Sequence, residues 1–124
     1  MSFILRGLIP DGGGLYFLPR RVGLARAKEL IFTGRRIEPQ EALAIGMIDR
    51  LTESATLVAE ARAWAEELSR GSMTALTLTK EILNRTFELG EEAVFALGRQ
   101  AQAICYTTDG HRDAVNAFLS KTQR

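Results

Sequence analysis

The chain has 124 residues, enough for one domain or part of one, and its 46% hydrophobic and 25% charged residues are ordinary values for a globular protein. Its formal net charge is +1, which argues against a nucleic-acid partner. No apolar run approaches the length of a membrane-spanning helix, so we expect no membrane partner either.

Cys105 is the single cysteine and His111 the single histidine. One cysteine cannot form a disulfide or a cysteine-based metal site within the chain, which favours an intracellular, cytoplasmic protein. We predict no metal site. Cys105 falls in an apolar helical stretch, so we expect a buried, unreactive thiol. For His111 we expect a surface or capping role and no part in catalysis.

A glycine-rich turn near the start of the chain has the most specific sequence. Residues 7–14 read Gly-Leu-Ile-Pro-Asp-Gly-Gly-Gly. The apolar segment Phe3–Ile9 predicts a short strand or the last turn of another element. Pro10 breaks the direction of the chain, and a short helix is predicted from about Gly12 to Arg20. Consecutive glycines leave the backbone open to close approach by another group, and their amides form an anion-friendly concavity.

Asp11, within this turn, has two interpretations. As an N-cap of the following helix, its carboxylate would accept hydrogen bonds from amides two or three residues later, and these bonds would favour its ionised form. As a catalytic acid or base, it would need apolar neighbours such as Leu8, Ile9 and Phe17 to favour its protonated form. The residue types alone favour the cap.

Short elements follow the turn. Apolar spacing predicts a helix over Leu24–Phe32, which Thr33-Gly34 is expected to end. Glu38 and Pro39 are expected to begin a short helix that Gly46 ends. Alternation over Met47–Leu51 predicts a short strand. This amount of strand cannot form a sheet by itself, so we expect a partner segment outside this chain.

Amphipathic helices are predicted from residue 55 to the end of the chain. Apolar residues recur there at helical spacing in four successive segments that glycines or turn residues separate. Asp109 is expected to cap the last helix. The apolar stripes contain Leu57, Ala61, Trp64 and Leu68; Leu76, Leu83 and Phe87; Val94, Leu97, Ala101 and Ile104; and Val115, Phe118 and Leu119.

Several motifs follow one another in order along nearly the whole chain. They are residues 7–14, Leu18–Gly23, Ala25–Leu30, Thr33-Gly34, Glu41–Arg50, Leu78–Lys80 and Asp109–Phe118. As an ordered set they resemble the crotonase superfamily, which is the enoyl-CoA hydratase/isomerase family. Each motif alone is a weak signal, whereas the ordered combination is specific.

The resemblance is to the C-terminal half of that family, so we expect this chain to be part of a longer protein. It implies an α/β fold, the C-terminal part of the crotonase-like spiral, mostly α-helical here with one or two short strands. Residues 1–54 would form the end of the spiral core with the active-site turn, and residues 55–124 a helical oligomerisation region. The implied protein partners are further copies in a trimer or hexamer, or a missing N-terminal half.

The chemistry implied by the resemblance acts on acyl-CoA thioesters through an enolate. The missing half would supply the oxyanion hole, and no cofactor is implied besides the coenzyme A of the substrate. Hydratases of the family carry a glutamate where this chain has Phe3, which cannot take up a proton. Several isomerases instead use an acid in the Pro-acid-Gly-Gly turn, where Asp11 stands. The closest resemblance is thus to enoyl-CoA or ring-opened phenylacetyl-CoA isomerases, with Asp11 as the catalytic residue that moves a proton between the α and γ carbons.

Substrate-binding residues are implied around the same turn. Gly12, Gly13 and Gly14 would let the acyl chain approach the backbone, or they form a flexible turn and nothing more. Tyr16 and Phe17 would line the acyl pocket, although their residue types favour a place in the core.

Phe118 and Lys121 match the family's Phe-x-x-Lys pattern and would bind coenzyme A. Otherwise they are a core phenylalanine and a solvated lysine. A second hypothesis is that the chain is a non-catalytic helical oligomerisation fragment that associates with full-length subunits or with a separate N-terminal half. Because the oxyanion donors are missing, we expect the isolated chain to be inactive.

Overall fold

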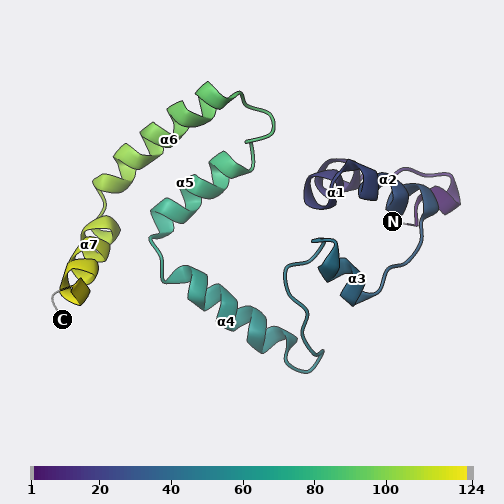
Figure 1. Cartoon of the computed structure of the whole chain (residues 1–124), viewed down its shortest axis with the longest axis horizontal. Helices are drawn as coiled ribbons and strands as arrows, with labels where there is room; N and C mark the ends of the chain where they lie inside the picture. The colour runs from purple at the N-terminus through teal and green to yellow at the C-terminus, as the bar shows by residue number, and fades with distance from the viewer. Residues whose placement is uncertain (1, 123–124) are drawn as a thin grey trace. The chain divides into compact units, whose positions relative to one another are not determined.

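The structure, a computed structural model, describes residues 2–122, with side chains described through residue 120. Contacts divide the chain into a first unit, Met1–Leu57, and a second unit, Val58–Arg124. The elements in chain order are the short 3₁₀ helix η1 (Ile4–Arg6), α1 (Gly14–Val22), α2 (Leu24–Thr33), α3 (Pro39–Ala44), α4 (Leu57–Ser69), α5 (Met73–Leu83), α6 (Glu91–Tyr106) and α7 (Asp109–Thr122) (Figure 1).

The first unit has a small hydrophobic core where α1 packs against α2 (Figure 1). Pro19 lies inside α1 and removes one amide donor, yet the helix continues to Val22. The core consists of buried Leu18, Ala27, Leu30 and Ile31, with Val22, Ile37, Ile45 and Met47 partly buried against it.

Glycine ends α2 as the sequence predicts. Gly34 has a φ of 60°, in the left-handed region, and its N–H donates to the carbonyl of Leu30 at 3.1 Å. A Cβ built on Gly34 would lie 2.9 Å from Leu5 Cγ and 3.2 Å from Ile4 Cγ2, so η1 packs directly on the end of α2. The absence of a side chain therefore lets these two elements meet.

The prediction for α3 is confirmed in its main features. Glu38 occupies the N-cap position and Pro39 the first helical position, although the Glu38 side chain makes no capping hydrogen bond. Gly46 follows with a φ of 73° and stops the helix. Proline at this position fits because its missing N–H would have no partner within the helix in any case.

Residues 2–122 contain no strand. Phe3–Ile9 was predicted as a strand or as the last turn of another element, and Met47–Leu51 as a strand. Residues 4–6 within Phe3–Ile9 form the 3₁₀ turn η1. In Met47–Leu51 the chain bends, because the amides of Met47 and Ile48 donate to the Ala42 carbonyl at 2.8 and 3.3 Å and not to a neighbouring strand. A strand needs such a neighbour for its backbone groups, and no described segment provides one.

Arg35 joins α2 to α3 through two carboxylates. Its Nε donates to Glu29 Oε1 at 2.6 Å, and its Nη2 donates to Glu41 Oε1 at 2.5 Å. Hydrogen bonds from Arg35 hold the pKa of both glutamates below the ordinary value, and the two glutamates raise the pKa of Arg35. Arg21 on α1 adds an ion pair to Asp49 and donates from Nε to the Met47 carbonyl at 3.3 Å.

In the second unit α5 packs against α6 and α6 against α7, yet no side chain among residues 58–120 is buried. Trp64 and Cys105 are both half-buried. The prediction that the Cys105 thiol is buried is therefore wrong. The apolar stripes lie largely open: Leu68 is 54% exposed and Leu83 is 61% exposed. Helical periodicity shows which face is apolar but not what covers it.

Thr108, and not Asp109, caps α7. Thr108 Oγ1 accepts from the His111 N–H at 3.2 Å, while Asp109 is the first residue of the helix and pairs with Arg112. The half-buried His111 ring makes an edge-to-face contact with Tyr106, with 5.1 Å between ring centroids. The predicted capping role of Asp109 is therefore wrong by one residue.

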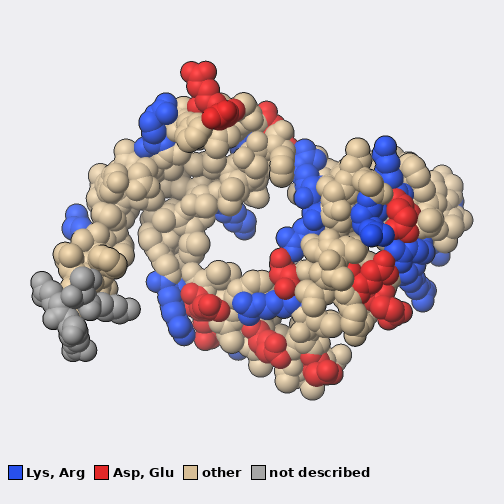
Figure 2. Space-filling view, viewed as in Figure 1, with Lys and Arg blue, Asp and Glu red and all other residues tan. Residues whose placement is uncertain are grey.

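No helix within residues 2–122 has both the length and the apolar character required to cross a lipid bilayer. Acidic and basic side chains are intermixed over the surface seen in Figure 2.

Candidate active site

Two consecutive tight turns form the glycine-rich segment before α1. The Asp11 N–H donates to the Ile9 carbonyl at 2.9 Å, and the Gly13 N–H donates to the Asp11 carbonyl at 2.8 Å. Both bonds span only two residues, the pattern of γ-turns. Pro10 is buried at the start of this segment, which anchors the turn to the first unit.

Asp11 is exposed on this turn, and its carboxylate forms no hydrogen bond or ion pair with the described residues. The prediction that Asp11 caps the helix is wrong. Helix α1 begins at Gly14, and its N-cap is Gly13, where no side chain makes a capping hydrogen bond. Asp11 lies two residues before the cap, because the left-handed conformation of Gly13 turns the chain into the helix there. The carboxylate is thus left without a structural role in the helix.

Gly13 is the residue at which the turn passes into α1. Its φ is 90°, which strains any residue with a Cβ, and a Cβ built there would lie 3.0 Å from Phe17 Cδ2 and Cε2. The Gly13 carbonyl accepts the first helical bonds, from the N–H of Tyr16 at 3.0 Å and of Phe17 at 2.9 Å. At Gly12 a Cβ would meet no atom within 4 Å. Close packing on the glycine backbone therefore occurs at Gly13, and the occupant is Phe17.

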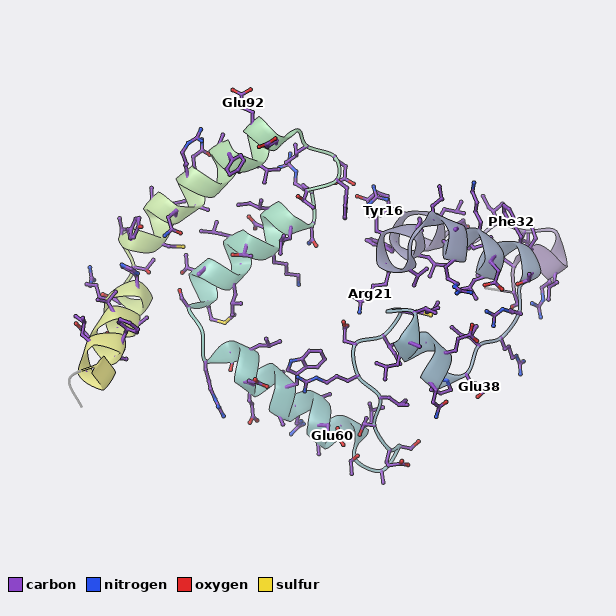
Figure 3. The ribbon with its side chains drawn as sticks, in the orientation of Figure 1. Tyr16, Arg21, Phe32, Glu38, Glu60 and Glu92 are labelled. Carbon is purple, nitrogen blue, oxygen red and sulfur yellow. The ribbon has the colours of Figure 1, made fainter. Side chains whose placement is uncertain are left out.

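The residue types of Tyr16 and Phe17 favoured a place in the core of the first unit, but neither side chain lies there. They are 40% and 67% exposed. Their rings meet edge-to-face, with 5.0 Å between centroids and an angle of 83° between ring planes. The Arg20 guanidinium stacks on Tyr16, with Cζ 3.5 Å from the ring centroid, and its Nη1 donates to the Tyr16 carbonyl at 3.0 Å. Figure 3 shows Tyr16 and Arg21 on α1 and Phe32 on α2.

The structure thus brings together Asp11, the glycines at positions 12–14, Tyr16 and Phe17 in one continuous segment of the first unit. Phe118 is on α7 in the second unit and is 69% exposed, so it does not belong to a core within this chain. Lys121 is in the last turn of α7, and its side chain lies outside the described residues.

Arg20 is a residue of this segment that the sequence interpretation missed. The signal was present, since Arg20 follows Tyr16 by four residues and such pairs lie on one face of a helix. Among the described residues, no group of three or more His, Cys, Asp and Glu side chains converges in a way that could hold a metal ion.

An open, mostly apolar groove lies in the second unit along α5 and α6. None of the described residues that line it carries a carboxylate. Its lining residues are Ile82, Val94, Phe95, Gly98, Arg99, Gln102, Ala103 and Tyr106.

Comparison with known proteins gives one consistent result. The family model described as enoyl-CoA hydratase/isomerase matches residues 1–124. The chain is 36% identical over 124 residues to a putative enoyl-CoA hydratase/isomerase of Bacillus subtilis, covering 99% of this chain and 48% of that protein. It is 33% identical over 115 residues to a short-chain-enoyl-CoA hydratase of Clostridium acetobutylicum, covering 93% of this chain and 44% of the relative.

A solved structure agrees with these sequence matches. The crystal structure of an enoyl-CoA hydratase/isomerase from Cupriavidus metallidurans superposes with a TM-score of 0.93 at 43% identity, covering 98% of this chain and 46% of that one. The chain therefore spans about half the length of the proteins that it matches.

Proposed function

Because this chain belongs to the enoyl-CoA hydratase/isomerase family, we propose that it forms part of an enzyme that moves the double bond of an enoyl-CoA thioester, with Asp11 as the acid/base. The main support for this proposal is the state of the Asp11 carboxylate, which is exposed on the glycine turn and makes no hydrogen bond or ion pair within the described residues. A carboxylate without a partner in the fold is accessible for proton transfer to a substrate.

In the proposed reaction the Asp11 carboxylate removes a proton from the α carbon of a β,γ-unsaturated thioester. The electrons move into the thioester carbonyl to give a dienolate, and protonated Asp11 returns the proton to the γ carbon. The double bond then lies between the α and β carbons, and no proton is gained or lost overall. Donors that stabilise the enolate oxygen are expected from the half of the family fold that this chain does not span, and the only cofactor in the reaction is the coenzyme A of the substrate.

An Asp11→Asn variant of the intact enzyme tests this proposal. Asparagine keeps the shape of the side chain but cannot accept the proton, so we expect turnover to fall by about 10²–10⁴-fold with binding of acyl-CoA largely retained. Asp49→Asn is the matched control, because Asp49 is also an exposed carboxylate of the first unit but is paired with Arg21. Isomerisation would be followed as conjugation of the double bond with the thioester. Turnover within a few-fold of the unmodified enzyme would exclude Asp11 as the acid/base.

Hydration is the competing reaction, and the similarity to a short-chain-enoyl-CoA hydratase of Clostridium acetobutylicum favours it. The position at which the resemblance places a hydratase glutamate is Phe3, which has no ionisable group. Assaying water addition to a crotonyl thioester beside isomerisation separates the two reactions. We expect isomerisation to be the faster reaction, and the reverse order would assign the enzyme as a hydratase.

A non-catalytic role is the second candidate function, and the open apolar stripes of the second unit favour it. Leu68, Leu83 and Phe118 are more than half exposed, as expected for surfaces that associate with other subunits. Calorimetry of this chain with an acyl-CoA distinguishes the two roles. Saturable binding in the micromolar range by the chain alone would count against a purely structural role.

A further inference from the structure

An aromatic ring is fixed over the glycine turn that carries Asp11. Phe17 follows Gly13 by four residues, and helical side chains point back toward the N-terminus of their helix. The ring therefore packs on the backbone of Gly13, where a Cβ would approach it to 3.0 Å. Phe17 therefore lies in the first turn of α1, beside the glycine turn.

Two contacts hold the ring in this position. Its edge-to-face partner Tyr16 is stacked under the Arg20 guanidinium, and the Phe17 N–H donates to the Gly13 carbonyl at 2.9 Å. Phe17 nevertheless remains 67% exposed. A ring that is held on one side and open on the other presents apolar surface at a small cost in conformational entropy on binding.

We propose that Phe17 is a specificity-determining residue that limits the length of the acyl chain, an inference that rests on the proposed function. Gly13 contacts both residues: the Gly13 N–H donates to the Asp11 carbonyl at 2.8 Å, and the Phe17 ring packs on the Gly13 backbone. Substrate carbons that exchange a proton with Asp11 lie beside this turn. Carbons farther from the thioester than the γ carbon meet the ring, so a short acyl chain fits and a longer chain is obstructed.

The test compares acyl chain lengths in the intact enzyme and its variants. We would measure kcat/KM for β,γ-unsaturated butenoyl-CoA and octenoyl-CoA with Phe17→Leu and Phe17→Ala. Removing the ring opens space, so the octenoyl/butenoyl ratio of kcat/KM is expected to rise by about tenfold or more in Phe17→Ala and by less in Phe17→Leu, in line with the effect of single methylenes on discrimination. Phe32→Ala is the matched control, since Phe32 is 66% exposed on α2 of the same unit (Figure 3).

The possible outcomes distinguish the role of Phe17 from the proposed function. A graded rise of the ratio with the size of the deletion at position 17, and an unchanged ratio in Phe32→Ala, supports the inference. An active enzyme with an unchanged ratio in both Phe17 variants overturns it and leaves the proposed function standing. An equal change in Phe17→Ala and Phe32→Ala also overturns it. An unmodified enzyme that is inactive on every enoyl-CoA tested overturns the proposed function itself.

Discussion

The guanidinium of Arg35 binds both carboxylate oxygens of Glu41, through Nη1 at 2.9 Å and Nη2 at 2.5 Å. The same group binds both oxygens of Glu29 on α2, through Nε at 2.6 Å and Nη2 at 3.2 Å. Lysine cannot reproduce this planar, double bidentate arrangement. One side chain therefore fixes the position of α3 relative to α2.

We expect the free energy of unfolding to decrease in acid because of this cluster. Arg35 lowers the pKa of Glu29 and of Glu41 below the ordinary value of 4.5 in the folded chain. Both carboxylates then bind protons less readily when folded, so their stabilisation is complete above that value and is lost as the pH falls through the lowered pKa. Urea titrations from neutral pH to below pH 4.5, followed by circular dichroism, measure this dependence.

Other carboxylates also titrate in this range, so the comparison needs a variant. Arg35→Met removes the shared partner and should weaken the acid dependence relative to the unmodified chain. Arg36→Met, at the exposed neighbouring position, should leave it unchanged. Equal acid dependence in the two variants would show that the cluster does not contribute.

Alanine at Gly34 should destabilise the first unit by about 1–3 kcal/mol. The residue has a φ of 60°, and the added Cβ would meet Leu5 Cγ at 2.9 Å, so both the backbone and the packing of η1 are strained. Gly98→Ala in α6 is the control: its Cβ would meet no atom within 4 Å. Removing a mid-helix glycine there should instead stabilise by roughly 0.5–1 kcal/mol. Urea unfolding of the two variants gives opposite signs if this account is correct.

Alanine at Thr108 should cost about 1 kcal/mol of stability, because the variant loses the cap of α7. Thr108 Oγ1 accepts from the His111 N–H at 3.2 Å and donates to the Cys105 carbonyl at 2.8 Å. The hydroxyl of the adjacent Thr107 donates to the Ile104 carbonyl at 2.8 Å and accepts from no amide of α7 within the described residues, so Thr107→Ala should cost less. Helical circular dichroism during urea unfolding compares the two. A Thr107 variant that is as unstable as the Thr108 variant would contradict the cap.

Local sequence rules were sufficient for the elements whose ends are marked by special residues. Helix α2 ends at a glycine and α3 begins at a proline, and both were predicted because these residues restrict the backbone by themselves. The conformation of residues 47–51 could not be predicted in the same way. A strand was predicted there, but a strand exists only if another segment accepts its hydrogen bonds. Within the described residues the amides of this bend turn back to Ala42 instead.

The candidate site was predicted as a segment but not in its internal geometry. Three consecutive glycines offer several places for the start of α1, and only the structure shows that Gly13 takes the left-handed conformation. That choice removes Asp11 from the cap position and places Gly13 under Phe17. The exposure of these side chains could not be predicted from residue type either. Tyr16 and Phe17 are aromatic, which favours a core, yet they are 40% and 67% exposed among the described residues.

Trp64, half-buried on α4, is the single tryptophan of the chain and belongs to the second unit. Its fluorescence therefore reports on the second unit, in which no side chain among residues 58–120 is buried. Far-ultraviolet circular dichroism reports on the helices of both units. A chain that unfolds in one cooperative step gives coincident transitions by the two probes. Separate transitions would show that the core around Leu30 unfolds independently of the α4–α7 helices, and would give each unit its own midpoint without any engineered label.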